Sequence, residues 1–142
     1  MAKSNVVNEP YPPHAALFLT GRDLDPQKIT TEFGVHPRRS YKRGDKRQNG
    51  EKDWSHGLWM LSSSGEIKDL DLSIHIKWLI DKLEPAKMGL IDISKDDSID
   101  AVISCFWIMP SLQEELVIDP ELLQQIAAFN IRFTLSVIAP DH

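Results

Sequence analysis

The most constraining feature of this sequence is an aspartate–proline pair placed after an apolar run, a pattern that occurs twice. In residues 17–35 the apolar run ends at Gly21, and Asp25 and Pro26 then mark the start of a helix. An aspartate side chain can accept hydrogen bonds from the free N–H groups of a first helical turn, and proline fits the first helical position because it lacks an N–H group. Gly34 can adopt the left-handed conformation that ends a helix. We therefore predict a strand, a turn and a short helix here.

The second occurrence lies near the C-terminus, where Asp119 and Pro120 begin the pattern and Asn130 takes the position of Gly34. Asparagine, like glycine, accepts the left-handed conformation that ends a helix. The spacing of these signals predicts a second helix about two residues longer than the first. The chain is thus predicted to contain two strand–helix–strand units.

The bulk composition is that of one soluble globular domain. The chain has 142 residues, of which 42% are apolar and 26% are charged. We expect residues 1–13, which contain three prolines, to form a flexible tail, and residues 14–142 to form a single domain. No apolar run approaches the ~18 residues of a membrane span and no secretory signal is recognisable, so we expect a cytoplasmic protein.

Apolar periodicity predicts the remaining elements. Strands are expected over 14–20, 40–43, 56–62, 100–109, 114–118 and 131–138, and helices over 26–33, 72–84 and from 120 onward, with a further helical turn or two at 86–93. Residues 114–118 are expected to pair back with 100–109 as a hairpin. This order predicts an α+β fold: a mixed, mostly antiparallel sheet with helices packed on one face, either ferredoxin-like or built from duplicated strand–helix–strand units.

The charge is distributed unevenly along the chain. Residues 36–52 contain seven basic side chains and two acids, about +5, which leaves roughly −10 on the rest of a chain whose net charge is −5. Clustered cations raise the local potential, so this segment is a candidate site for an anion or a small molecule. The candidate residues are Arg38, Arg39, Lys42 and Arg43, facing a pocket lined by Trp54 or Trp59. The alternative is a solvated loop and hairpin whose charges only aid solubility.

Alternation places Trp54 and His56 on the same side of a strand, either as the wall of a small-ligand site or, as we favour, as core residues. His36, His56 and His75 lack the spacing of metal ligands, so we expect no metal and no cofactor. Cys105 lies in an apolar strand and is expected to be a buried, inert thiol.

His75 is the strongest candidate for acid–base chemistry, because it borders the apolar stripe of a predicted helix. In the alternative interpretation a neutral imidazole hydrogen-bonds a backbone carbonyl and holds this helix to the sheet. Catalysis would need a carboxylate or a nucleophile beside it, and no motif in the sequence supplies one. We therefore assign no catalytic residues.

Six short motifs occur in the order and spacing of a known family. They are residues 19–26, 29–30, 41–45, 57–59, 75–85 and 116–123. On these motifs the chain resembles a bacterial family catalogued as domain of unknown function 4279. The resemblance implies a small bacterial cytoplasmic protein without an established activity. It also implies that Gly44, Trp59 and His75 fill recurrent family positions.

Three functions follow from these observations. The first is a non-catalytic binding protein with a protein partner, in its sharpest form an immunity-type inhibitor of a toxin. A toxin that acts on nucleic acid would be basic, so acidic residues would bind it; the candidates are Asp96, Asp97, Glu114 and Glu115. The second is the small-molecule or anion-binding module, and the third is an enzyme that uses His75. Nucleic acid is not an expected partner of a chain with this acidic balance.

Overall fold

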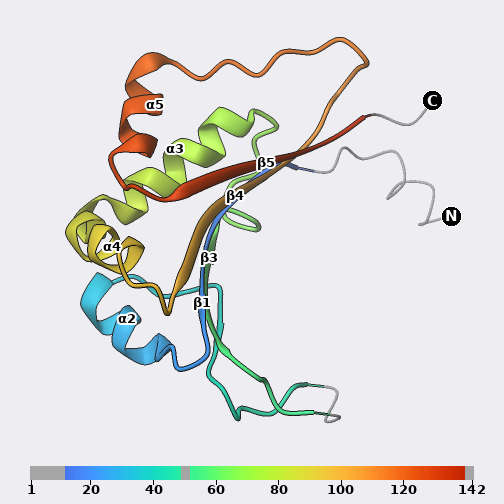
Figure 1. Ribbon diagram of the computed structural model, residues 1–142. Coiled ribbons are helices and arrows are strands. Elements are labelled where there is room, and N and C mark those ends of the chain that lie inside the picture. Colours follow the sequence, from blue (N-terminus) through green and yellow to red (C-terminus); the bar gives the residue numbers. More distant parts are fainter. Residues whose placement is uncertain (1–11, 49–51, 140–142) are drawn as a thin grey trace, which may run out of the picture.

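The computed structural model describes residues 12–48 and 52–139 (Figure 1). In chain order the elements are β1 (His14–Gly21), α2 (Pro26–Phe33), β2 (Arg39–Tyr41), β3 (Gly57–Ser62), α3 (Leu72–Leu83), a 3₁₀ turn (Glu84–Ala86), α4 (Lys87–Ser94), β4 (Asp100–Ile108), α5 (Pro120–Ala127) and β5 (Arg132–Ile138). The predicted flexible tail over residues 1–13 falls almost entirely outside the described residues.

The strands form one sheet in the order β2-β3-β1-β4-β5. β1 pairs antiparallel with both β3 and β4, and β2 pairs antiparallel with β3, whereas β5 runs parallel to β4. From β1 to β4 the chain follows the β-α-β-β-α-β order of a ferredoxin-like arrangement, with α4 added between α3 and β4, and β5 after α5 extends the sheet at one edge. Figure 1 shows the helices together on one side of the sheet. The prediction of a mixed, mostly antiparallel sheet with helices on one face is confirmed.

The core lies between the helices and the face of the sheet that they cover. Alternate residues of β1, Ala15, Leu17 and Leu19, are fully buried there. The register places Trp59 and Leu61 of β3, and Ile103 and Cys105 of β4, on the same face. Burial of each large apolar side chain in this layer contributes about 1.5–3 kcal/mol.

The opposite face of the sheet carries no helix in the part of the chain that the structure describes (Figure 1). Phe18, Met60 and Val102 meet on this face and are half-buried. His14 stacks on Phe106, with ring centroids 5.3 Å apart. These contacts give the face an apolar centre without a second layer.

The signals at α2 form as predicted. The Asp25 carboxylate accepts hydrogen bonds from the backbone N–H groups of Gln27 and Lys28, at 3.1 and 3.4 Å. Gly34 ends the helix with φ of 70°. The local sequence therefore determines both ends of this helix.

The second occurrence of the pattern forms only in part. Asn130 has the predicted left-handed conformation, with φ of 58°. However, α5 has eight residues, as α2 does, so the prediction of a longer helix is wrong. The Asp119 side chain also makes no capping hydrogen bond. The last turn tightens after Ala127, because Phe129 turns inward and is fully buried in the core.

The predicted strand over residues 114–118 is wrong. Both edges of β4 are already occupied, by β1 on one side and by the parallel strand β5 on the other. The segment instead connects β4 to α5, and its alternating apolar residues Leu116 and Ile118 are partly buried against the core. Their alternation reflects packing against the core without strand pairing.

Candidate anion-binding site

β2, the start of β3 and the residues that connect them form an extended hairpin arm, residues 39–48 and 52–57. This arm projects beyond the rest of the sheet (Figure 1). Its two sides are joined by the hydrogen bonds from Gly44 N to Trp54 O and from Trp54 N to Asp45 O, both 2.9 Å. Gly44 has φ of 91°, which favours glycine. A further antiparallel bridge joins Lys46 to Asp53. This register brings Trp54 next to β2.

Two aromatic rings and two guanidinium groups form a cluster on the arm. The rings of Tyr41 and Trp54 stack with centroids 3.7 Å apart and an angle of 10° between them. The guanidinium carbon of Arg47 lies 4.4 Å from the Trp54 ring centre, and that of Arg39 lies 5.5 Å from the same centre. Both guanidinium groups therefore lie beside the same ring. We call Arg39, Tyr41, Arg47 and Trp54 the guanidinium–aromatic cluster.

The cluster lines an open hollow of about 860 Å³. The other lining residues are Ser40, Asp45, Lys46 and Gln48. The Asp45 carboxylate already takes part in a hydrogen bond, because its Oδ2 accepts the backbone N–H of Lys42 at 2.9 Å. Lys46 forms an ion pair with Asp53 at 3.6 Å. The hollow thus has more positive than negative charge around it.

Within residues 12–48 and 52–139, neither Arg39 nor Arg47 forms an ion pair. The buried Nε of Arg47 also has no hydrogen-bond acceptor among these residues. A guanidinium group presents its N–H donors in a planar fork that matches the oxygens of a carboxylate or a phosphate. The chemistry that fits this site is therefore that of an oxyanion.

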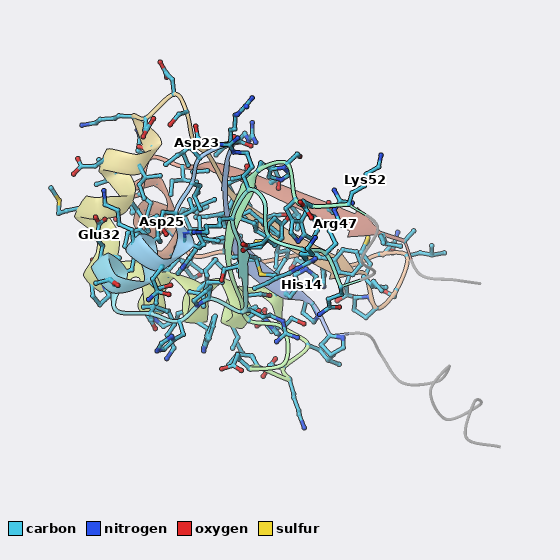
Figure 2. All side chains as sticks on the ribbon, turned by 90° about the horizontal axis from the view of Figure 1, so that it is seen from below. His14, Asp23, Asp25, Glu32, Arg47 and Lys52 are labelled. Atoms are coloured by element: carbon cyan, nitrogen blue, oxygen red, sulfur yellow. The ribbon has the colours of Figure 1, made fainter. Side chains whose placement is uncertain are left out.

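Figure 2 shows Arg47 and Lys52 on one side of the view and the acids Asp25 and Glu32 on the other. Of the residues that line the hollow, three are basic and one, Asp45, is acidic, so the local potential favours negative ligands.

The structure brings together only two of the six residues predicted for this site, Arg39 and Trp54. Arg38 instead donates from Nη1 to the carbonyl oxygen of Ser64 at 2.6 Å. Arg43 forms an ion pair with Asp23 at 2.8 Å. Both cations are therefore already engaged with the protein. Lys42 is exposed and does not line the hollow.

Of the two tryptophans proposed to line the pocket, only Trp54 lines the hollow. Trp59 is fully buried, donates from Nε1 to the Thr30 hydroxyl at 3.0 Å and packs edge-on against Phe33, so its prediction as a pocket wall is wrong. Trp54 lies outside the core, so its interpretation as a core residue is also wrong. His56, which was expected in the core with it, is half-buried on the arm and meets the Tyr41 ring edge-on at 6.2 Å.

Tyr41 and Arg47 lie in the basic segment but were not among the individual residues predicted for the site. Alternation along β2 places Arg39 and Tyr41 on one face, which was a usable signal. The positions of Arg47 and Trp54 depend on the register of the arm, which residue type alone does not determine.

His75 is fully buried and both of its ring nitrogens are engaged. Nε2 lies 2.6 Å from the carbonyl oxygen of Asp69, and a carbonyl only accepts, so Nε2 carries the hydrogen. The Ser63 hydroxyl then donates to Nδ1 at 2.7 Å, and the same oxygen accepts the backbone N–H of Ala15 at 3.0 Å. This geometry favours the packing interpretation of His75.

Burial shifts the pKa values of two other groups, Cys105 and His14. Burial raises the pKa of the Cys105 thiol to about 12, so the thiolate that a nucleophile requires is disfavoured. The pKa of His14 is lowered, first by burial and then by electrostatic interaction with His75 and Arg38. Neither shift points to a reaction.

The four acidic candidates do not form one surface. Asp96 and Asp97 precede β4, and Glu114 and Glu115 follow it, so a nine-residue strand with a length on the order of 30 Å separates the pairs. The Ser98 hydroxyl and N–H hydrogen-bond to Asp96 and lower the pKa of its carboxyl. Glu114 accepts the hydroxyl of Ser111 at 2.8 Å.

Among the described residues, no three His, Cys, Asp or Glu side chains gather where a metal ion would bind. No helix in the same part of the chain has the length and apolar character to cross a membrane. A family model described as "Domain of unknown function (DUF4279)" matches residues 10–139. No curated protein and no solved structure matches the chain.

Proposed function

The chain belongs to the DUF4279 family of unknown function, and we propose that it is a non-catalytic binding protein that holds an oxyanion at the guanidinium–aromatic cluster. The observation that carries the proposal is the pair of guanidinium groups, Arg39 and Arg47, beside the Trp54 ring without an ion-pair partner among the described residues. The ligand class is a phosphate or a polycarboxylate.

The arrangement suits an anion for two physical reasons. Both guanidinium groups line the same hollow without an ion pair among the described residues, and an anion in the hollow compensates their positive charge. Stacking on an aromatic ring also restricts each side chain before binding, so less conformational entropy is lost when the ligand binds. A hydrogen bond between a guanidinium group and an anion contributes about 1.5–3 kcal/mol.

A role in binding agrees with the state of the two groups that chemistry would use. His75 has both nitrogens engaged inside the core, and Cys105 has a raised pKa. These observations support a binding role over an enzyme that uses His75.

The immunity-type role stays a prediction that ranks below anion binding. A basic toxin would have to contact acidic pairs at opposite ends of β4, whereas the basic arm offers one continuous surface to an acidic partner. We keep the expectation of a bacterial, cytoplasmic protein, which the family resemblance implies.

Thermal unfolding with a panel of anions tests the proposal, because a ligand that binds only the folded state raises the melting temperature. The panel comprises inorganic phosphate, pyrophosphate, nucleoside phosphates and citrate at low ionic strength. We expect at least one to raise the melting temperature of the wild type but not of the double variant Arg39→Gln/Arg47→Gln.

The matched control is Arg22→Gln/Lys28→Gln, which removes the same charge from exposed positions near α2. This variant should respond to the anion as the wild type does. A panel without effect on the wild type, or an equal response from the double variant of the cluster, would contradict the proposal.

A further inference from the structure

The two edges of the sheet differ in how they are protected against pairing with another strand. β2 is a three-residue edge with Arg39 exposed on it, and short, charged edges resist pairing. β5 forms the other edge, and it pairs with β4 without a bulge over seven residues that include no proline, lysine or acid. Its side chains Leu135, Val137 and Ile138 are 39%, 47% and 46% exposed. A long apolar edge of this kind is a surface for strand pairing.

The direction of the backbone groups of β5 follows from one hydrogen bond. Met109 N donates to Ile138 O at 3.0 Å, so the backbone groups of Ile138 point toward β4. Backbone direction alternates along a strand, so Thr134 and Ser136 also point toward β4. The N–H and C=O groups of Phe133, Leu135 and Val137 therefore point away from the sheet at its free edge.

This edge is complementary to itself. If two copies pair antiparallel about a two-fold axis at Leu135, Leu135 lies opposite its copy and Phe133 lies opposite Val137. These are the residues with free backbone groups, so each pair exchanges two hydrogen bonds. Between them Thr134 lies opposite Ser136, a favourable cross-strand pair on the other face of the sheet.

The charges permit this pairing although the chain is negative overall. The only charged residue of β5, Arg132, forms an ion pair with Asp100 at 3.4 Å. In this register Arg132 lies opposite Ile138, so no like charges face each other across the pair. The exposed apolar side chains are removed from water at the same time. A second copy of this chain thus hydrogen-bonds the edge backbone groups and covers the exposed apolar side chains, and it places no like charges opposite each other.

We propose that β5 is a homodimerisation site, at which two copies pair antiparallel about Leu135 and form one continuous sheet. The site lies at the opposite edge of the sheet from β2, which carries Arg39 and Tyr41 of the guanidinium–aromatic cluster. The dimer therefore leaves the proposed anion site open and does not depend on it.

Cysteine cross-linking tests the register. Thr134 and Ser136 would form a non-hydrogen-bonded pair with Cα atoms about 4.5 Å apart, within disulfide reach. Mixed Thr134→Cys and Ser136→Cys chains should form a covalent dimer under oxidation. Either variant alone should not, since its own copies have Cα atoms roughly 8 Å apart. Cys105 does not interfere, because it is fully buried.

Light scattering over a dilution series tests whether the chain forms a dimer and whether β5 is its interface. The wild type should be dimeric at high concentration, and Leu135→Lys and Val137→Lys should be monomeric with an unchanged circular dichroism spectrum. The control Met88→Lys, at a 71% exposed apolar position on α4, should remain dimeric. A wild type that is monomeric at every concentration, a dimer that survives both lysine variants, or mixed cysteine chains that do not cross-link would each overturn the proposal.

Discussion

The Ser63 hydroxyl lies 2.7 Å from Nδ1 of His75, and through this contact a buried serine joins α3 to the start of β1. The same oxygen accepts the backbone N–H of Ala15, and Nε2 of His75 reaches the carbonyl oxygen of Asp69. The imidazole therefore links α3 to Asp69, to Ser63 and, through Ser63, to the start of β1.

We expect His75→Ala to lower the free energy of unfolding by about 2–4 kcal/mol, because it leaves buried polar groups unpaired and a space in the core. Urea denaturation measures this loss. The control His36→Ala, at an exposed position, should change stability by less than about 0.5 kcal/mol. Wild-type stability in His75→Ala would contradict the packing role.

We expect the two tryptophans of the central segment to respond differently to substitution. Trp59→Phe removes the N–H that donates to Thr30 and opens space in the core, so it should lower the free energy of unfolding by about 1–2 kcal/mol. Trp54→Phe keeps a stacked ring on the half-exposed arm and should cost less than Trp59→Phe. Equal losses in urea denaturation would contradict the assignment of Trp59 to the core and Trp54 to the site.

The lowered pKa of His14 predicts a pH dependence of stability. Below the ordinary histidine pKa of about 6.5 the unfolded chain binds the proton more readily than the folded chain does. Stability from this group is therefore fully present above about pH 6.5 and is lost as the pH falls from there toward the lower folded pKa. His14→Gln should flatten the dependence of the unfolding free energy on pH between about 7 and 5. An unchanged slope in this variant would show that other groups cause it.

Much of the fold could be predicted because its signals are local. Asp25, Pro26 and Gly34 mark the ends of α2 within a few residues, and apolar periodicity locates β4 and β5 to within one residue at each end. The prediction of a strand over residues 114–118 failed because strand pairing depends on residues that are distant in the sequence. Two apolar residues in alternation suit a strand and a core-packed connection equally well.

The region of the candidate site could be predicted from the sequence, but the arrangement of its side chains could not. The excess of cations in residues 36–52 identified the arm. The sequence does not show which cations remain unpaired, because their partners are distant in the chain. Arg43 forms an ion pair with Asp23, and Arg38 donates a hydrogen bond to the carbonyl oxygen of Ser64. The stack of Tyr41 on Trp54 depends on the register of the arm, which residue types alone leave open.

The most direct test of anion binding observes the two guanidinium groups themselves. NMR spectra that resolve the arginine Nε–H signals are recorded while pyrophosphate is added, and in a separate titration citrate. At least one of the two anions should shift the signals of both Arg39 and Arg47, and the shifts should saturate. The signal of Arg132, which lies in β5 at the opposite edge of the sheet from β2, should not move. If the Arg39 and Arg47 signals stay in place with both anions, or if all arginines shift alike without saturation, the cluster is not the anion-binding site proposed here.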